Sequence, residues 1–490
     1  MKYFTESRQW WAELFLVGLV LFVGVALRTI QVDRYPVNNL DDGVYYVWAG
    51  ASFWQNPFSP TSFTLFVEEN PNLFWRSAYL DELPDMEFGF RMVEPWFDHP
   101  PLGAALIGLP AYLLGYTNYE NVPYGIVRLM AVVASIFTLT FTYLLIRELF
   151  GRKLATITTV VLAATPYFVF AHRQSYLENI LTPFFLLAVW QGYRAVNNKS
   201  TGGWAIVIPV IAAFLCGWIK LVGLVVPLLL ALWSVRQRNQ RLAIIFAITF
   251  ALSLGSYILY GVIADQNAFI FTLFNQGVRG TQWGNLAQIF NNMRLAGPLF
   301  ADTTLTLGWI ATLIYTVGHS FFSKQAENDS SASYISWLFA CWLLIVILTS
   351  GTLNSFIWYR YPLFPILSFG IAWLIHSLWQ KQNLLGSSIL ALLGWSQLSV
   401  VAFDFTQNFD LRLLIVATVA IPFILFVISN ILSLKKVWLS HALLIHRLWL
   451  VAILTLIITT NILVVLQFPR HNCAQAQCTL PTKIMVQIAE

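Results

Sequence analysis

Long apolar runs separated by short polar breaks dominate the pattern of this chain. A hydrocarbon core of about 30 Å takes roughly 20 apolar residues in a helix to cross, and about thirteen runs approach that length. The predicted spans are residues 10–31, 124–146, 154–171, 177–196, 204–219, 221–235, 242–264, 300–322, 334–351, 361–379, 385–403, 411–433 and 444–467. The break at Lys220 is the least distinct, because two short runs flank it. The pattern predicts an all-α polytopic membrane protein of about thirteen transmembrane helices.

The composition agrees with a membrane protein. The 490 residues are 58% hydrophobic and only 10% charged, with 20 Trp and 38 Phe, whereas soluble domains carry about 25% charged residues. The net charge of +5 matters less than the positions of the charges, so no nucleic-acid partner is expected. Residues 10–31 exceed a signal-peptide apolar region of roughly 7 to 15 residues and lack a small-residue cleavage site, so we interpret them as a retained anchor.

The basic residues follow the positive-inside rule if the N-terminus is cytoplasmic. The loops after the even-numbered spans then hold Arg147, Arg152, Lys153, Arg194, Lys199, Arg236, Arg238, Arg241, Lys324, Lys381, Lys435 and Lys436. The first outer loop, residues 32–122, is acidic instead, with Asp33, Asp41, Asp42, Glu68, Glu69, Asp81, Glu82, Asp85, Glu87, Glu94, Asp98 and Glu120 against Arg34, Arg76 and Arg91. This asymmetry sets the predicted orientation.

Three outer segments belong to a single predicted domain, residues 1–490. The first outer loop is too long for a simple connection and too aromatic for a disordered tether, so we expect short amphipathic helices at the membrane interface. Residues 265–299 form a second aromatic outer segment, and residues 468–490 an outer tail. Cys473 and Cys478 in that tail are either a disulfide of an oxidising compartment or two free thiols. Cys216 and Cys341 lie in apolar runs and are interpreted as packing residues.

Two adjacent acids, Asp41 and Asp42, lie just beyond the first span. Either acid could cap a helix running from about Gly43 to Trp54, since Asp is a favoured N-cap and a helix N-terminus stabilises negative charge. Only one residue occupies a cap, however, and neighbouring carboxylates raise one another's pKa, as a general base requires. We expect one acid to face a cavity and the other to make a structural bond.

Asp98 and His99 precede Pro100 and Pro101 at the start of another apolar run. Consecutive prolines pre-set the first turn of a helix, so capping by Asp98 or His99 is one interpretation. The alternative is that the rigid turn fixes His99 at the rim of an outer cavity, where its ring binds a phosphate.

Three further cations lie at the outer ends of spans. They are Arg173 in the hairpin between the third and fourth spans, Lys220 between two apolar runs, and Arg360 before the late Tyr-Pro sequence. Each could snorkel to the water interface, or face the same outer cavity. Glu178 lies just inside an apolar span, where a lone carboxylate is costly, so we expect it to be paired.

Carboxylates and cations on one side of a membrane suit the transfer of a sugar from a lipid phosphate. An acid deprotonates the incoming hydroxyl, and cations stabilise the leaving phosphate as its negative charge grows. Arginine grips phosphate through two bonds, while lysine acts as a point charge. A long lipid donor also explains why such a site is built within a bilayer.

Taken in chain order, these stretches resemble the GT-C membrane glycosyltransferases. The most similar group is the phospholipid carrier-dependent transferases, which include protein O-mannosyltransferases and aminoarabinose (lipid A) transferases. The resemblance rests on the acid pair, His99-Pro100-Pro101-Leu102-Gly103, the Arg/Glu hairpin, Gly217-Trp218-Ile219-Lys220, and Arg360-Tyr361-Pro362-Leu363-Phe364-Pro365.

The resemblance implies a GT-C-like fold and an inverting transfer from a polyprenyl-phosphate-linked sugar. It assigns the catalytic role to Asp41, with Asp42 in the place usually held by Glu. It assigns donor-phosphate binding to His99 and Arg360 and, with looser spacing, to Lys220. The sequence has no inserted MIR-like domain, so a bacterial enzyme is expected rather than a eukaryotic protein mannosyltransferase.

The complete prediction is a sugar transfer to an acceptor hydroxyl or phosphate outside the bacterial cytoplasmic membrane, on its periplasmic or exterior face. The catalytic residues are Asp41 and Asp42, the donor-phosphate ligands are His99, Arg173, Lys220 and Arg360, and the supporting residues are Asp98, Glu178, Tyr45 and Tyr359. The partners are a polyprenyl-phosphate-sugar, membrane lipid, and a lipid, glycan or protein acceptor. No cofactor or metal ligand is predicted, although a divalent ion is left open.

Two other functions remain open at this stage. An oligosaccharyltransferase or polymer ligase would use a diphosphate-linked glycan, and some such enzymes hold a divalent ion in several carboxylates. A lipid-glycan transporter would move its cargo without transfer, but transporters often carry internal repeats and midplane polar residues, whereas the charges here gather at one side.

Overall fold

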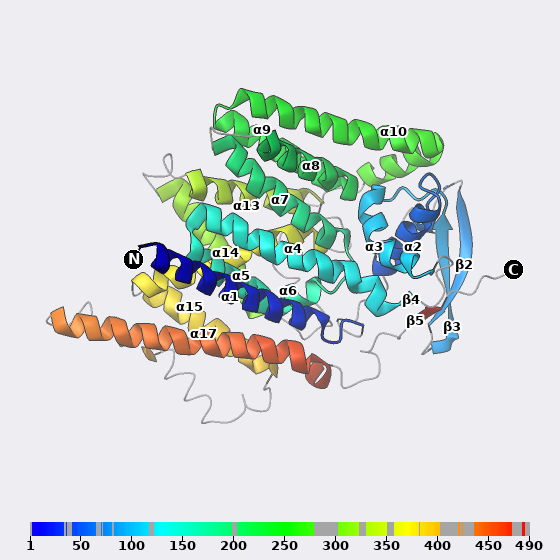
Figure 1. Ribbon diagram of the computed structural model, residues 1–490. Coiled ribbons are helices and arrows are strands. Elements are labelled where there is room, and N and C mark those ends of the chain that lie inside the picture. The colour runs from blue at the N-terminus through cyan, green and yellow to red at the C-terminus, as the bar shows by residue number, and fades with distance from the viewer. Residues whose placement is uncertain are drawn as a thin grey trace.

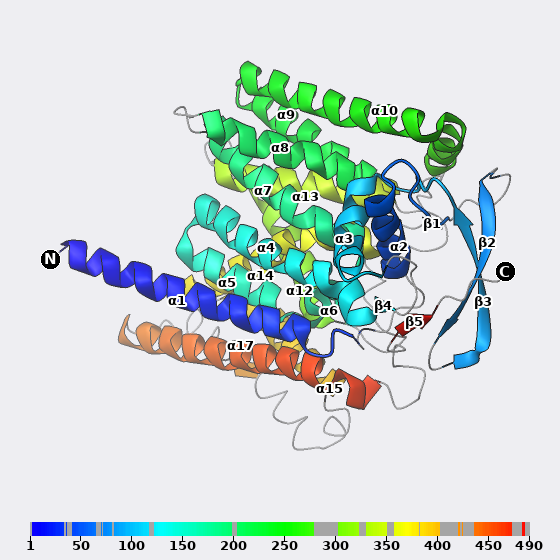
Figure 2. The same ribbon diagram turned by 45° about the vertical axis from the view of Figure 1, so that its right-hand side comes forward.

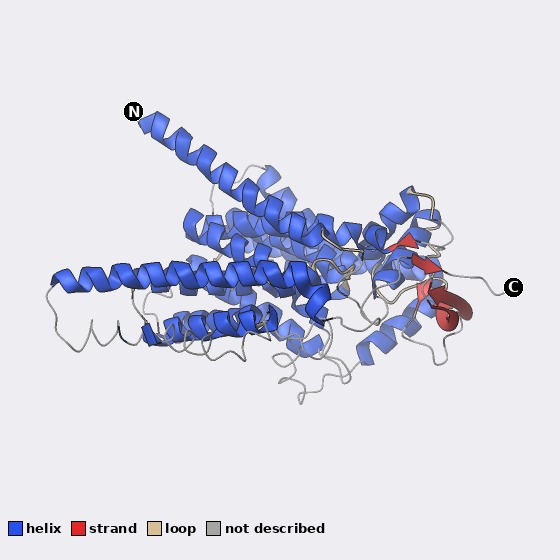
Figure 3. Cartoon of the chain, turned by 90° about the horizontal axis from the view of Figure 1, so that it is seen from below, coloured by secondary structure: helices blue, strands red, loops and turns tan. Residues whose placement is uncertain are grey.

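The computed structural model is a bundle of helices with a small β-sheet at one end (Figure 1). It describes residues 2–33, 36, 42–64, 70, 72–80, 83–116, 122–197, 203–278, 302–322, 330–349, 357–381, 383–401, 420–421, 424, 436–472 and 483–485. Seen with helices and strands coloured apart, the strands gather at one end of the bundle, while the N-terminal end of α1 (Lys2–Thr29) projects from the opposite end (Figure 3).

Most predicted spans coincide with helices of the bundle. The helices are α4 (Tyr124–Phe150), α5 (Arg152–Ala164), α6 (Pro166–Ala171), α7 (Leu177–Asn197), α8 (Gly203–Ile219), α9 (Val225–Arg236), α10 (Gln240–Val278), α12 (Thr303–Val317), α13 (Ser330–Thr349), α14 (Phe364–Gln380), α15 (Leu384–Val401) and α17 (Lys436–Asn472). The predicted span 411–433 lies almost wholly outside the described residues.

The protein is an integral membrane protein by the length and apolar character of its helices. In the described part of the chain, five helical segments are long and apolar enough to cross a membrane: Tyr124–Phe150, Gln240–Gly277, Ser330–Thr349, Trp358–Gln380 and Leu443–Leu466. Shorter apolar helices include Pro101–Leu113, Gly203–Ile219 and Leu221–Arg236. The total of about thirteen crossings remains a prediction.

Local sequence explains where several helices break. Thr165 is the C-cap of α5, and Pro166 directly after it starts α6. The break lies here because proline cannot continue a helical hydrogen-bond ladder. Lys220 is extended between α8 and the short 3-10 helix η1 (Leu221–Leu224), so the two apolar runs around it form separate helices. Helix α10 is kinked at Asp265, whose φ of -164° and ψ of 103° are not helical. Apart from this kink, residues 265–278, the described part of the second outer segment, are helical.

The first outer loop contains two helices and most of a sheet. Helix α2 (Asp42–Gln55) matches the predicted helix, and α3 (Pro101–Leu113) begins at the second proline. Residues 73–93, expected to form interfacial helices, form strands β2 (Leu73–Leu80) and β3 (Leu83–Val93) instead. The all-α prediction is therefore wrong in this part. Short aromatic segments fit a half-buried strand as well as a helix, and periodicity alone does not separate the two.

The sheet has five strands in the order β1-β3-β2-β5-β4, with antiparallel neighbours. Strand β1 (Ser62–Phe63) pairs with the end of β3, and β2 and β3 form a hairpin. Strand β5 (Lys483–Met485) joins β2 to β4 (Val122–Pro123). The turned view shows the hairpin beyond α2 and α3, on the side away from the bundle (Figure 2). Residues 483–485 thus pair with strands of the first outer loop.

The core of the bundle is apolar and aromatic. Phe168, Leu186 and Trp342 are buried in its largest cluster, which extends outward to Trp48 of α2 and Phe63 of β1. Cys216 of α8 is buried and Cys341 of α13 is partly buried, and both are free, in agreement with packing roles. Cys473 and Cys478 lie outside the described residues, so their pairing stays open.

Candidate functional site

Close helix packing brings the Pro-Pro turn to Lys220, which directly follows α8. A Cβ at Gly50 would lie 1.9 Å from the Ala104 carbonyl oxygen, so α2 and α3 cross almost backbone to backbone. A Cβ at Gly103 would lie 2.8 Å from the Ile219 carbonyl oxygen. Small residues allow such approaches. The first turn of α3 therefore sits against the end of α8, directly beside Lys220.

Lys220 and Glu178 form a buried ion pair. The Lys220 Nζ lies 2.5 Å from the Glu178 Oε1, and the two side chains are 3% and 0% exposed. The same Nζ lies 4.3 Å from the centre of the Tyr359 ring, a cation–π contact. The expectation that Glu178 is paired is confirmed. Glu178 Oε2 is buried without a hydrogen-bond partner in the described chain, so it is an acceptor that a water or a bound hydroxyl would satisfy.

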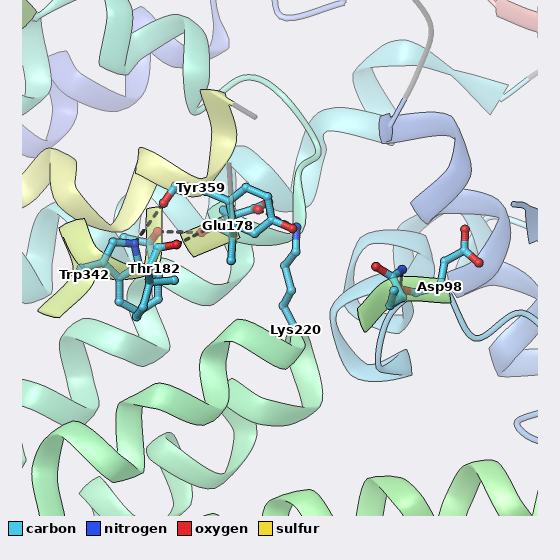
Figure 4. A network of polar contacts seen from close by, with 9 residues as sticks. Asp98, Glu178, Thr182, Lys220, Trp342 and Tyr359 are labelled. Atoms are coloured by element: carbon cyan, nitrogen blue, oxygen red, sulfur yellow. Dashed lines mark hydrogen bonds and ion pairs between the residues drawn. The ribbon is translucent and has the colours of Figure 1, made fainter. Parts of the chain in front are cut away.

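The Asp98 side of the site is held by residues from two other segments. Thr64 Oγ1 donates to Asp98 Oδ1 at 2.9 Å, and Gln276 Nε2 of α10 donates to the Asp98 carbonyl oxygen at 2.7 Å. Figure 4 shows Lys220 extending between Glu178 and Tyr359 on one side and Asp98 on the other. Residues of the first outer loop and of α7, α8 and α10 thus meet in one region.

Neither Asp98 nor His99 caps α3. The N-cap is Pro100, so neither residue occupies the capping position. The capping interpretation of this stretch is wrong, because the two prolines move the helix start beyond both side chains. The His99 ring packs instead 5.8 Å from the Tyr46 ring and 5.9 Å from the Trp96 ring. Phosphate binding by His99, the alternative interpretation, stays a prediction.

Arg360 and Tyr359 lie in a 3-10 helix that is fastened to the bundle. This element, η4 (Ile357–Leu363), precedes α14. Trp342 Nε1 donates to the Tyr359 carbonyl oxygen at 3.0 Å, and Tyr361 Oη donates to Gln174 Oε1 at 2.8 Å. Arg360 is 1% exposed. Snorkelling to water therefore does not explain Arg360, or Lys220 at 2% exposure.

Arg173 has a structural contact that the sequence did not indicate. The side chain is buried and donates to the Leu27 carbonyl oxygen at the end of α1. Snorkelling is the wrong explanation here too, because the guanidinium points into the protein. Its neighbour His172 accepts from Arg28 Nε at 3.1 Å. Burial and the nearby Arg28 guanidinium hold the pKa of His172 well below its usual range.

Two buried arginines were missed. Arg28 in the last turn of α1 donates to the carbonyl oxygens of Gly24, Leu162 and Ala163. Arg128 in α4 donates to those of Val32 and Pro36. A cation inside an apolar span is the available signal for both, since such residues are rare and seldom face lipid. Arg28 thus ties the end of α1 to the end of α5, and Arg128 holds Val32 and Pro36, on either side of residues 34–35.

The structure describes only part of the acid pair, Asp41 and Asp42. Asp42 is the first residue of α2, and its side chain is not described. Asp41 lies outside the described residues, so its role stays a prediction. Tyr45, one turn into α2, packs its ring 4.4 Å from Phe63, and its carbonyl oxygen accepts from Ser62 Oγ at 2.6 Å. The start of α2 is thereby fixed to β1.

Known proteins match parts of this chain. Residues 98–260 match the family described as dolichyl-phosphate-mannose-protein mannosyltransferase. A protein of Bacillus subtilis (strain 168) named "Putative mannosyltransferase YkcB" is 27% identical over 155 residues, which are 32% of this chain and 19% of that protein. This chain therefore aligns with only about a fifth of the length of the curated relative.

Solved structures of two membrane proteins can be superposed on most of the chain. ArnT from Cupriavidus metallidurans in the apo state has a TM-score of 0.48 at 16% identity, over 94% of this chain and 78% of that one. The oligosaccharyltransferase AglB from Archaeoglobus fulgidus, in complex with an inhibitory peptide and a dolichol-phosphate, has a TM-score of 0.48 at 13% identity, over 93% and 56%.

The matched family and the Bacillus subtilis relative agree with the resemblance drawn from the sequence. The chain resembles the GT-C membrane glycosyltransferases, as the sequence predicts. Within that class, the matched family model and the Bacillus subtilis relative are both of the mannosyltransferase-like kind.

Proposed function

We propose that this protein transfers a sugar, with inversion, from a polyprenyl-phosphate-linked donor to an acceptor hydroxyl or phosphate outside the membrane. The observation that carries the proposal is the meeting of Asp98, the Glu178–Lys220 pair and Tyr359 at the end of the bundle that holds the sheet. A membrane-embedded cation beside a carboxylate-bearing loop suits a lipid phosphate and an incoming hydroxyl.

Contacts of the described residues support some of the proposed roles. Lys220 is the first donor-phosphate ligand, because Glu178 and the Tyr359 ring orient its ammonium group. His99 and Arg360 are the other proposed phosphate ligands. Arg173 is the weakest of the four predicted ligands, since it already binds the Leu27 carbonyl oxygen. Asp41 is the proposed general base, and Asp42, at the start of α2, is its structural neighbour.

The donor and location are part of the same proposal. A polyprenyl-phosphate-sugar is the proposed donor, and a lipid, glycan or protein the acceptor. The bacterial cytoplasmic membrane is the proposed location, with the site on the periplasmic or exterior face. We propose a metal-independent reaction, because lysine, histidine and arginine supply positive charge for the leaving phosphate. Retained activity after chelation is the expected result.

The experiment measures transfer by the purified full-length protein in lipid nanodiscs, with a labelled undecaprenyl-phosphate hexose as donor. Asp41→Asn should lower the rate about 100-fold or more, the contribution of a general base, and Lys220→Ala should lower it by about as much, the loss when one charge-stabilising group is removed. Lys381→Ala, which changes an exposed lysine after α14, is the control and should keep full activity.

Distinct results contradict the proposal. Full activity in both Asp41→Asn and Asp42→Asn would show that neither acid is the general base, and would rule out the proposed site. Product formed only from a diphosphate-linked glycan, with loss on chelation, would identify an oligosaccharyltransferase or polymer ligase. Movement of labelled lipid-linked sugar across vesicles without any transfer would identify a transporter.

A further inference from the structure

A long apolar groove runs along the side of the bundle that carries α1 and α17. Its volume is about 600 Å³, and it is bordered by α1, α5, α12, α14, α15 and α17. Val160, Ile371, Leu390 and Leu454 are typical of its lining. None of the proposed sugar-transfer residues whose side chains are described lines it, so we treat it as a separate feature from the candidate site.

The groove has polar residues at both ends and the length of one lipid chain. Lys153 and His376 lie at one end, and Thr165, Thr304 and Asn461 at the other. From Lys153 to Ala164 helix α5 rises about 17 Å, at 1.5 Å per residue. One leaflet of a bilayer is about 15 Å of hydrocarbon, half of the roughly 30 Å core. The groove therefore spans one leaflet.

The Lys153 end is positively charged. Lys153 is exposed at the mouth of the groove. Arg447 of α17 donates to the carbonyl oxygen of Trp379, another lining residue, at 3.2 Å and lies over its ring. Glu13, one turn before the lining residue Leu16, is already bound by Arg147 and Arg152 at 3.1 and 3.0 Å. By the positive-inside rule, this end faces the cytoplasm.

We propose that the groove binds one acyl chain of an anionic phospholipid of the cytoplasmic leaflet, with the headgroup phosphate on Lys153 and Arg447. Basic pockets between transmembrane helices on the cytoplasmic side are suited to anionic headgroups. Apolar contact alone gives little preference, because surrounding lipid tails are equally apolar. The preference for one lipid over another therefore comes from the charged headgroup, while the groove determines where the acyl chain lies. This proposal does not depend on the proposed sugar transfer.

Native mass spectrometry of the delipidated full-length protein tests the site. The probes are palmitoyl-oleoyl-phosphatidylglycerol and the matching phosphatidylcholine. The wild type should retain one phosphatidylglycerol about tenfold more tightly than phosphatidylcholine. Lys153→Glu should abolish that preference. Arg241→Glu is the matched control, because Arg241 is an exposed arginine of α10, on the other side of the bundle from α17 (Figures 1 and 2). It should leave the preference unchanged.

A second variant separates the effect of the apolar groove on lipid retention from the effect of the positive charge. Val160→Trp fills the groove and should weaken retention of both lipids, while Lys153→Glu weakens only phosphatidylglycerol. Equal retention of the two lipids by the wild type would overturn the proposal, as would an equal loss in Arg241→Glu. Retention unaffected by Val160→Trp would show that the lipid binds elsewhere, and no retention at all would show that the chain itself closes the groove.

Discussion

At the scale of single residues, the Glu178–Lys220 pair shows how much of a contact can be predicted from one residue and its neighbours in the sequence. A carboxylate just inside an apolar span predicts a charged partner, and that prediction is confirmed. The partner itself, 42 positions away in the sequence, could not be predicted, because it depends on how α7 packs against α8. Likewise, Tyr359 joins this pair only because η4 is fastened to the α6–α7 hairpin.

Removing one member of the buried pair should be costly. Glu178→Gln leaves Lys220 buried without its counter-charge, and breaking a buried pair in this way costs about 3 to 5 kcal/mol of unfolding free energy. Glu148→Gln is the matched control, because its partner Arg194 lies 3.8 Å away and both side chains are 36–44% exposed. That pair should contribute less than about 1 kcal/mol. Unfolding in detergent measures both, and equal losses would contradict the prediction.

His172 should make stability depend on pH. Its pKa is lowered in the folded protein, chiefly by burial and further by Arg28, so the unfolded chain binds the proton more tightly. The contribution of neutral His172 to the free energy of unfolding should therefore be complete above about pH 6.5, the pKa of His in an unfolded chain. Below that pH the free energy of unfolding should fall, by up to about 1.4 kcal/mol per pH unit.

The His172→Asn variant isolates this group, because an amide oxygen can still accept from Arg28 but does not titrate. Unfolding measured from pH 7.5 to 5 should give a shallower slope for the variant than for the wild type. Identical slopes would mean that His172 is not the group responsible.

At the scale of elements, the apolar runs predicted the helices well, and the sheet was missed. Spans are fixed locally by composition, so helices such as α4 and α13 lie close to their predicted bounds. Strand β5 has three residues and pairs with β2 and β4, far away in the sequence. Pairing of that kind leaves no local pattern. The helix start at the Pro-Pro turn was predicted, but the tight crossing of α2 and α3 behind it was not.

That crossing gives a sharp test of the packing. A Cβ at Gly108 would lie 2.3 Å from the Ala51 nitrogen, so Gly108→Ala forces the backbones of α2 and α3 apart and should cost about 1 to 3 kcal/mol or more. A Cβ at Gly18 of α1 meets nothing within 4 Å, so Gly18→Ala should be neutral or stabilising by up to about 1 kcal/mol. Thermal unfolding of both variants in detergent is the measurement. A stable Gly108→Ala protein would show that α2 and α3 do not cross so closely.

At the scale of the whole molecule, the candidate site is assembled from segments of the first outer loop, α7, α8, α10 and η4. The sequence could nominate these residues because each is polar at the end of an apolar run. It could not separate residues that bind a phosphate from those that bind the protein's own carbonyl oxygens, such as Arg173. Burial and hydrogen-bond partners identify the residues that bind carbonyl oxygens.

The place of β5 in the sheet also constrains the path of the chain through the membrane. Because residues 483–485 pair with β2 and β4 of the first outer loop, both segments lie on one side, and an even number of crossings must separate them. If α1 crosses once, the total is odd. A membrane-impermeant thiol reagent should therefore label Asn56→Cys and Lys483→Cys from the same side, in a background without native cysteines. Labelling from opposite sides would contradict the sheet, whatever the number of spans.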